Sequence, residues 1–213
     1  MSEHICAKHC APSDRGGKAN ARRDRIVQAA RELFSENGFH ATGIARISER
    51  SGVLVGQIYR DFANKEAIVA ALVQRDLDIF LFTDEFRRAR VTRDHDLARA
   101  WIARFISGED IPDMRLVSEI LAEATRNPRV ADIFRAVDER LREQLIEALQ
   151  IIVPGDAPAH KVRCLADAIM IFSGGMCQGR MVLAENPAPE VLMLLMQMID
   201  REVALISHGD GTC

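Results

Sequence analysis

The sequence of 213 residues has no apolar run long enough to span a bilayer and no signal-peptide core near its start. We therefore expect a cytoplasmic protein without a membrane partner. Its five cysteines lack the spacing of a disulfide framework, which argues against a secreted, disulfide-stabilised scaffold. No segment alternates apolar and polar residues like a half-buried strand, so the sequence predicts an all-α fold.

Motifs of common enzymatic chemistry are also missing. The sequence contains no phosphate-cradling glycine loop, no zinc-protease motif and no nucleophile elbow. Asp94 and Asp96 flank His95, but this triplet lies at the expected start of a helix and is typical of a solvated cap. The pattern argues against an enzyme, and no cofactor is expected.

An apolar stripe marks a first helix within residues 22–72. Its members follow the i, i+3, i+4, i+7, i+8 spacing of one helix face: Ile26, Ala29, Ala30, Leu33 and Phe34. Asn37 and Gly38 are expected to end this helix, because glycine readily adopts the left-handed conformation that follows many helices. Thr42 is placed to cap the next helix, and Asn64 and Asn127 are placed to cap two longer ones further along the chain.

Two short helical patterns between Ile44 and Phe62 are separated by a tight turn around Gly52. This arrangement predicts a helix-turn-helix, with Ile58 of the second helix turned inward. A short helix carried on a compact three-helix body fits the major groove of double-stranded DNA. The segment therefore indicates a DNA-binding regulator.

The same segment resembles the amino-terminal domain of the TetR family, regulators that are similar to the tetracycline repressor. The matching positions are Ala30, Leu33, Phe34, Gly38, Phe39, Thr42, Ile47, Gly52, Val53, Gly56, Ile58, Tyr59, Phe62, Lys65 and Glu66. The resemblance covers roughly a quarter of the chain, and the other three quarters match the family only in length and helical character. It implies a homodimer that binds a palindromic operator and is released by a small-molecule effector.

Four positions depart from the family pattern. Leu54 stands where a Ser or Thr commonly caps the recognition helix, and leucine cannot accept the amide hydrogen bonds of that turn. Gly43 replaces a frequent hydroxyl residue, Ser48 a common alanine and Asp61 a frequent histidine. These departures leave the fold prediction unchanged but prevent transfer of a known operator sequence.

The predicted DNA contacts lie on the second and third helices and at the start of the fourth. They are Thr42, Gly43, Val55, Gly56, Gln57, Tyr59, Arg60 and Lys65. Gln57 can bind an adenine edge bidentately, and Arg60 can reach a guanine or a phosphate. The resemblance implies that Thr42, Tyr59 and Lys65 contact phosphates.

Domain boundaries follow from these patterns. We expect a flexible tail, a DNA-binding domain, a ligand-binding and dimerisation domain and a second tail at residues 1–19, 20–66, 67–208 and 209–213. Residues 1–75 contain 12 Lys or Arg and 8 Asp or Glu, a net charge of +4, so the remainder carries −7. A basic head on an acidic body fits phosphate contact at one end. Arg22, Arg23 and Arg25 are candidates to reach DNA from a flexible arm.

A pocket for a hydrophobic effector is implied by the resemblance. Large, adaptable apolar side chains in the central helices are its candidate lining: Trp101, Phe105, Met114, Phe134, Met170, Phe172 and Met176. A methionine or phenylalanine at helical spacing is more often an ordinary core residue. The chemical identity of the effector is not encoded in a recognisable motif.

The last two long helices are assigned by the resemblance to a dimer interface. Residues 191–203 carry an apolar surface wider than an amphipathic helix needs. Gly174, Gly175 and Gly179 would allow two helices to cross closely, or would form a local kink or a pocket wall. Two recognition helices then meet half-sites about 34–36 Å apart.

Three alternatives stay open. His4, Cys6, His9 and Cys10 could bind zinc or copper, but their spacing is not a standard zinc signature, and no metal site is predicted. A thiol-based redox sensor would need its cysteines to pair, and Cys164 and Cys177 are too far apart on one helix. A non-specific architectural DNA binder would carry positive charge throughout, whereas the body is acidic.

Overall fold

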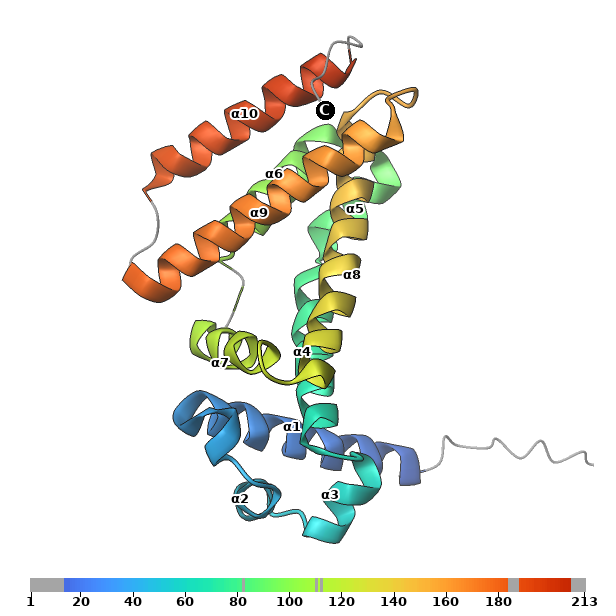
Figure 1. The fold of residues 1–213 in the computed structure, drawn as a ribbon. Coiled ribbons are helices and arrows are strands. Elements are labelled where there is room, and N and C mark those ends of the chain that lie inside the picture. Colours follow the sequence, from blue (N-terminus) through green and yellow to red (C-terminus); the bar gives the residue numbers. More distant parts are fainter. Residues whose placement is uncertain (1–13, 82, 110, 112, 184–187, 208–213) are drawn as a thin grey trace, which may run out of the picture. The chain divides into compact units, whose positions relative to one another are not determined.

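A computed structural model describes residues 14–81, 83–109, 111, 113–183 and 188–207. These residues form helices and no strand, so the all-α prediction is confirmed (Figure 1). The helices are α1 (Asp14–Ala41), α2 (Ile44–Ser51), α3 (Val55–Asp61), α4 (Lys65–Leu81), α5 (Asp84–Thr92), α6 (His95–Ser107), α7 (Met114–Ala124), α8 (Pro128–Ile152), α9 (Ala159–Leu183) and α10 (Pro189–Ser207). No described helix is both long and apolar enough to cross a membrane.

The chain divides into two compact units, Met1–Ile68 and Val69–Cys213. The sequence placed the corresponding boundary between residues 66 and 67. Helix α4 therefore carries residues of both units. We call them the amino-terminal unit and the body.

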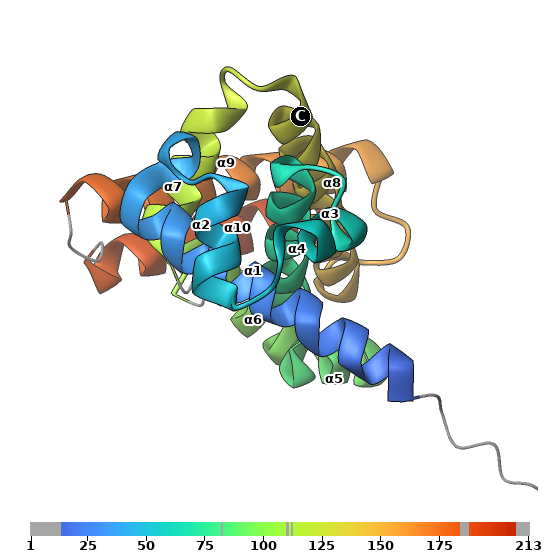
Figure 2. The same cartoon turned by 90° about the horizontal axis from the view of Figure 1, so that it is seen from below.

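The amino-terminal unit packs α1, α2 and α3 around one small core (Figure 2). The predicted stripe of α1 supplies most of it, and all five stripe residues are buried. Ile47 of α2, Ile58 of α3 and Phe62 close the core from the other side. Apolar spacing along three short helices therefore determines which face of α3 remains exposed.

The end of α1 differs from the prediction in one respect. Gly38 has φ 79° and ψ 164°, a conformation that is accessible almost only to glycine. The positive φ was predicted, but helical structure resumes after this interruption and continues to Ala41. Gly52 ends α2 in the left-handed conformation, with φ 66°, and its amide donates to the carbonyl of Ser48.

Thr42 does not cap α2, so that prediction was wrong. The cap position is Gly43, which has no side chain to offer. The Thr42 amide donates to the Phe39 carbonyl at 3.3 Å, which leaves the Gly38 carbonyl without its usual helical donor. The Thr42 hydroxyl lies 2.9 Å from that carbonyl and is fully buried. The interruption at Gly38 thus explains why this hydroxyl faces α1.

The predicted tail of residues 1–19 also needs a correction. Helix α1 begins at Asp14, so residues 14–19 belong to it, and Arg22, Arg23 and Arg25 lie on a helix rather than on a flexible arm. Contacts of Arg22 with Asp61 anchor this part of α1 within its unit. The candidate metal ligands in the first ten residues lie outside the described residues.

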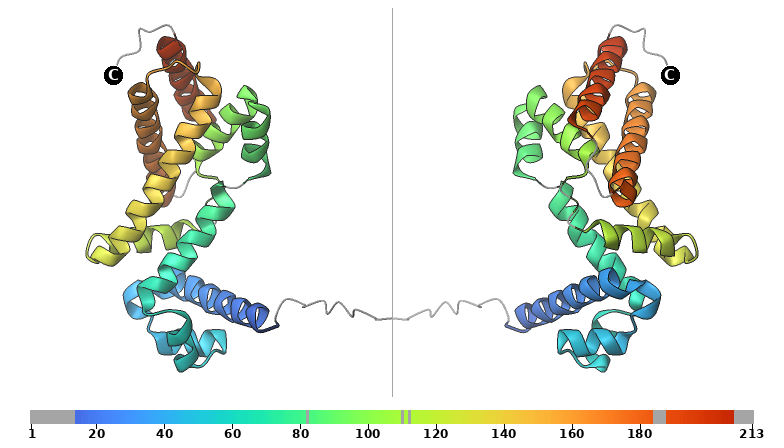
Figure 3. Two further views of the ribbon diagram at one scale, coloured as in Figure 1. Left: turned by 90° about the vertical axis from the view of Figure 1, so that its right-hand side faces the viewer. Right: turned by 90° about the vertical axis from the view of Figure 1, so that its left-hand side faces the viewer.

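In the body, α6 lies at the centre and packs against α5, α8, α9 and α10. Trp101 of α6 stacks on Phe86 of α5, with ring centroids 4.4 Å apart, and is only 2% exposed. Helices α9 and α10 run side by side along the body (Figure 3). Side-chain caps begin several helices, including the predicted cap of α8 at Asn127. The predicted cap of α4 is likewise confirmed, because the Ala67 amide donates to Asn64 Oδ1 at 2.8 Å.

Candidate nucleic-acid interface and effector pocket

Helix α3 presents a mixed apolar and polar face to solvent. Leu54 at its start is 72% exposed, Val55 is 40% exposed and Tyr59 is 55% exposed. Gly56 and Arg60 are also exposed, and Gln57 is partly exposed. Ile58 is fully buried, as predicted, so it fixes the rotation of α3 about its own axis. The exposed face therefore consists of the residues that the sequence predicted to meet DNA, with Leu54 in addition.

Leu54 occupies the cap position of α3. Its backbone has φ −60° and ψ 141°, the extended geometry of a capping residue, but its side chain makes no capping hydrogen bond. A serine or threonine there would satisfy an amide of the first turn. A large apolar side chain instead points into solvent, where it contributes nothing to the core.

Lys65, the first residue of α4, is held inside its own unit. Its Nζ atom donates to the Phe39 carbonyl at 2.6 Å and to the Thr42 carbonyl at 3.1 Å. The same ammonium lies 3.8 Å from the centre of the Phe39 ring. Lys65 therefore ties the start of α4 to the end of α1, a role that the sequence did not reveal.

Asp61 at the end of α3 binds the arginines of α1. Arg22 donates to both carboxylate oxygens, from Nε at 2.6 Å and from Nη2 at 2.8 Å. Arg23 donates to the Asp61 carbonyl at 2.6 Å and lies 4.3 Å from the centre of the Phe62 ring. The hydrogen bonds from Arg22 hold the pKa of the Asp61 carboxyl below its usual range. The ion pair between Arg22 and Asp61 therefore joins α1 to the end of α3.

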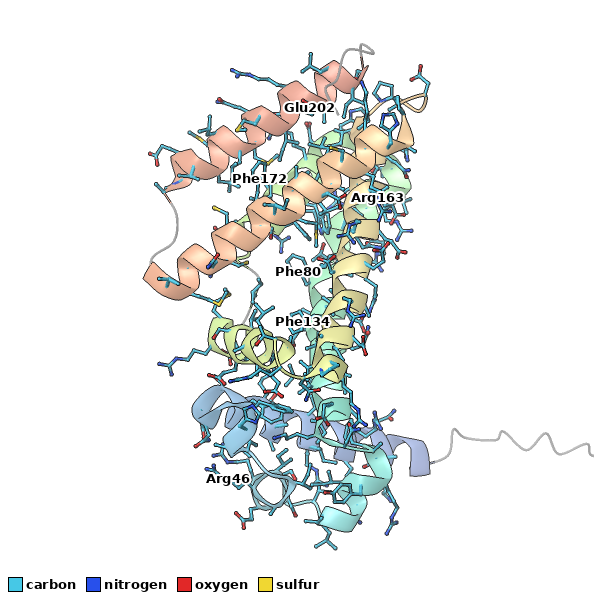
Figure 4. The ribbon with its side chains drawn as sticks, viewed as in Figure 1. Arg46, Phe80, Phe134, Arg163, Phe172 and Glu202 are labelled. Carbon is cyan, nitrogen blue, oxygen red and sulfur yellow. The ribbon has the colours of Figure 1, made fainter. Side chains whose placement is uncertain are left out.

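Two further arginines lie on α2. Arg50 is bound by Glu32 and Glu36 of α1, each at 3.0 Å, which neutralises its charge locally. Arg46 is exposed on α2 and lies beside the α1 end, donating to Asn37 and Ala41 at 3.3 Å (Figure 4). Arg46 was not among the DNA contacts predicted from the sequence. Its sequence signal was a basic residue on the solvent face of the first helix of the predicted helix-turn-helix.

The body contains an apolar pocket of about 210 Å³. Its wall is built by α4, α7 and α8, together with residues of α6 and α9 and of the segment before α7. The lining residues are Leu72, Val73, Asp76, Leu77, Phe80, Phe105, Ile111, Asp113, Leu116, Val117, Ile120, Phe134, Val137, Leu141 and Ser173. Figure 4 shows Phe80 and Phe134 between α9 and α7 in that view.

Only Phe105 and Phe134 of the predicted lining residues belong to this wall. Trp101 is a core residue, and Met170 and Met176 pack against the same core. Phe172 lines a separate groove between α9 and α10. Met114 begins α7 but is not part of the pocket wall. The selection by side-chain size missed the smaller aliphatic residues of α4 and α7, which form most of the lining.

The cysteines of α9 do not pair with each other, as their spacing predicted. Cys164 is disulfide-bonded, whereas Cys177 is a free, half-buried thiol. Burial raises the pKa of the Cys177 thiol, which disfavours the reactive thiolate. Within the described residues, no group of three or more His, Cys, Asp or Glu side chains could hold a metal ion.

Comparison with known proteins supports the assignment of the amino-terminal unit. A family model described as bacterial regulatory proteins, tetR family, matches residues 26–72. The chain is 32% identical over 129 residues to the HTH-type transcriptional regulator UidR of Escherichia coli, an alignment covering 55% of this chain and 59% of UidR. It is 37% identical over 62 residues to the HTH-type transcriptional repressor KstR2 of Mycobacterium tuberculosis, covering 29% and 31% of the two chains.

A solved structure extends the likeness to the whole fold. GusR of Salmonella enterica matches with a TM-score of 0.67 at 23% identity, covering 86% of this chain and 96% of GusR. The curated relatives are matched over less than two thirds of their own length. Both curated relatives are named as transcriptional regulators and not as enzymes.

Proposed function

We propose that the chain is a sequence-specific transcriptional repressor of the TetR family of bacterial regulatory proteins. It binds its operator as a homodimer and leaves the operator when a small hydrophobic molecule is bound. The exposed face of α3 is the observation that supports DNA binding most strongly. Large apolar side chains on a solvent-exposed helix of a small unit need a partner surface. The major groove accommodates such a helix.

We assign direct DNA contact to the exposed residues of α2 and α3. Gln57 reads an adenine edge, Arg60 binds a guanine or a phosphate, and Tyr59 binds a phosphate. Gly43 and Gly56 have no neighbouring atom within 4 Å of an added Cβ, so they leave room for the sugar-phosphate backbone. The remaining contact is Val55, whose apolar side chain fits the C5 methyl group of thymine.

Leu54 joins this list on the basis of its exposure. An apolar side chain that is 72% exposed, at a position where a hydroxyl would stabilise the helix, fits a contact with a thymine methyl group. Thr42 and Lys65 are removed from it, because the hydroxyl is buried and the ammonium binds backbone carbonyls. Both residues position α2 and α4 for the neighbouring contacts.

The proposed dimer interface lies on α9 and α10. Seven large apolar side chains of the described parts of these helices are between 42% and 74% exposed: Ile171, Val182, Val191, Met193, Leu194, Met198 and Leu205. When two copies of the chain pair through this surface, its apolar side chains are removed from water. The resulting dimer presents two recognition helices, one from each copy. A twofold arrangement requires an operator with twofold symmetry.

The apolar pocket is the proposed effector site. Helix α4 lines it with Leu72, Val73, Asp76, Leu77 and Phe80, and the first residues of the same helix belong to the amino-terminal unit. A ligand that prefers one position of α4 would shift the balance between DNA-binding and DNA-free dimers. Moving that balance from 1:99 to 99:1 requires about 5.5 kcal/mol of difference in ligand binding between the two states.

Selection of binding sites from a random DNA pool tests this function. The full chain is incubated with the pool at physiological salt, bound DNA is recovered, and the cycle is repeated. Enrichment of one palindromic sequence supports the proposal and supplies the operator. A pool that stays random after several rounds contradicts sequence-specific binding. A variant carrying Gln57→Ala and Arg60→Ala is the control, and it should not enrich the same sequence.

A further inference from the structure

A second hollow of the body lies between α5 and α8, and we call it the arginine groove. Its volume is about 420 Å³, which falls within the range of roughly 300–1,000 Å³ that small-molecule sites occupy. Its described lining residues do not overlap with those of the apolar pocket. They come from α5, its carboxyl end and α8, and they are Arg87, Arg90, Val91, Arg93, Glu147 and Ile151.

Two of the arginines are held by acidic partners. Arg90 Nε lies 2.7 Å from Glu147 of α8, and Arg87 Nη2 donates to Asp84 at 2.5 Å. A guanidinium carries five N–H donors, and each of these ion pairs engages one nitrogen. The acids therefore orient the two side chains and leave further donors for a ligand in the groove.

The third arginine has an unusual backbone. Arg93 has φ 55° and ψ 39°, and it is the one non-glycine residue with positive φ in the described part of the chain. This left-handed conformation is strained for a residue with a side chain, and glycine is usual where it ends a helix. Arg93 Nη2 donates to the Gln150 carbonyl near the end of α8 at 2.7 Å, and its guanidinium lines the groove. Strained residues of this kind cluster at ligand sites.

The charge of the groove is opposite to that of the body. Residues 76–213 carry a net charge of −7, whereas the groove lining contains three arginines and one glutamate. Counting both acids that its arginines bind, Asp84 and Glu147, the groove keeps one positive charge. An anion is therefore the ligand that its charge favours.

The number of donors favours a phosphate over a carboxylate. A guanidinium binds two oxygens of either group side by side. Three guanidiniums offer more donors than the two oxygens of one carboxylate can accept. A phosphate monoester has three terminal oxygens and a charge of about −1.5 to −2 at neutral pH. It matches the set of three arginines better in both respects.

The groove also has an apolar side. Val91 of α5 is 81% exposed, although it lies among the arginines. Ile151 of α8 is buried and packs with Ala89 and Ala98, so this side of the groove rests on a small core. A ligand with an organic group covers the exposed valine and removes apolar surface from water.

From this combination we infer that the arginine groove binds an organic phosphate, namely a phosphate monoester with a compact apolar group. The phosphate is bound by Arg87, Arg90 and Arg93, and the organic group lies against Val91 and Ile151. The site is additional to the proposed effector pocket and does not depend on it.

Three compounds test the ligand class. Phenyl phosphate and phenyl sulfate have the same shape and differ by one negative charge at about pH 8. Inorganic phosphate keeps the charge but lacks the ring. Binding to the full chain is measured by isothermal titration calorimetry at constant ionic strength, because salt screens exposed charges. Phenyl phosphate is expected to bind about fivefold more tightly than phenyl sulfate and about threefold more tightly than inorganic phosphate.

Substitutions of the arginines locate the site. Arg87→Gln and Arg93→Gln each remove one positive charge, and the double variant is expected to bind phenyl phosphate at least about tenfold more weakly. Arg135→Gln is the matched control. Arg135 is as exposed as Arg87 and likewise pairs with an aspartate three residues before it, but it lies on α8 outside the groove. The control should bind phenyl phosphate within about twofold of the unaltered chain. Urea unfolding verifies that each variant is folded; Arg87→Gln removes only a local, exposed ion pair and is the variant to use if Arg93→Gln unfolds the chain.

Each outcome decides one part of the inference. Equal binding of phenyl phosphate and phenyl sulfate by the unaltered chain overturns the assignment to a phosphate, and equal binding of inorganic phosphate overturns the role of the apolar side. Undiminished binding of phenyl phosphate by the folded arginine variants, or no binding by the unaltered chain, overturns the site itself. The operator selection and the apolar pocket involve none of these arginines, so a failure here leaves the proposed function intact.

Discussion

Replacement of Leu54 by serine is expected to change protein stability and DNA recognition in opposite directions. The backbone of Leu54 already has the geometry of a capping residue, so a serine hydroxyl can accept an amide hydrogen bond of the first turn of α3. Such a cap stabilises a helix by about 1 kcal/mol. Leu54→Ser should therefore raise the free energy of unfolding by about that amount, because the exposed leucine contributes little to the core.

The effect on DNA follows from the loss of an apolar contact. Removing one methyl group from an apolar interface weakens it by about 0.8 kcal/mol, which is about a fourfold change in affinity. Deoxyuridine lacks the thymine methyl group, so its substitution at the contacted position should weaken binding of the unaltered chain about fourfold. Leu54→Ser should bind the thymine and deoxyuridine operators equally.

The assay combines urea unfolding with gel-shift titrations of operators in which each thymine is replaced in turn. Leu54→Ala is the matched control, since alanine neither caps the helix nor reaches the methyl group. It should lose the discrimination without gaining stability. If Leu54→Ser still discriminates between the two bases at every position, Leu54 does not contact a thymine methyl group. If the stability of Leu54→Ser falls, the serine does not cap α3.

Three further predictions concern the contacts that hold the fold. Asp61→Asn should destabilise the chain at neutral pH, because the hydrogen bonds from Arg22 favour the Asp61 carboxylate in the folded chain and hold its pKa low. The difference in stability from the unaltered chain should shrink in acid-unfolding curves as the pH falls below the ordinary aspartate pKa of about 3.9, because that carboxylate then becomes protonated. Gly108→Ala should lower the free energy of unfolding, measured in urea, more than Gly52→Ala does. Both glycines have φ above 60°, so alanine is strained at either position. Only at position 108 would the new Cβ also lie 2.9 Å from a sulfur atom. Lys65→Met should lower the free energy of unfolding by about 2 kcal/mol, because the charged hydrogen bonds to two backbone carbonyls are lost. It should leave the salt dependence of DNA binding unchanged. If the slope of the logarithm of the binding constant against the logarithm of the salt concentration instead falls in magnitude by about one, Lys65 contacts a phosphate.

Features that depend on local spacing could be predicted from the sequence. The stripe of α1, the inward side of Ile58 and the caps at Asn64 and Asn127 each follow from residues within one or two helical turns. The all-α fold and the position of the recognition helix follow from the same periodicity. Local patterns were sufficient because short amphipathic helices can bury their apolar faces in few ways.

Features that depend on tertiary contacts could not be predicted. Arg22 and Asp61 are 39 positions apart, and no periodicity relates them. The role of Thr42 depends on a carbonyl that becomes available only because Gly38 interrupts α1. The pocket brings together five helices, so its wall could not be listed from the size of individual side chains.

Sequence recognition by α3 can be measured as the ratio of two dissociation constants. The full chain is titrated at physiological salt against its selected palindrome and against a scrambled duplex of the same composition. A ratio of about 10³ or more, which falls when Gln57 is replaced by alanine, is the predicted result. Equal affinity for the two duplexes would mean that α3 does not recognise a DNA sequence.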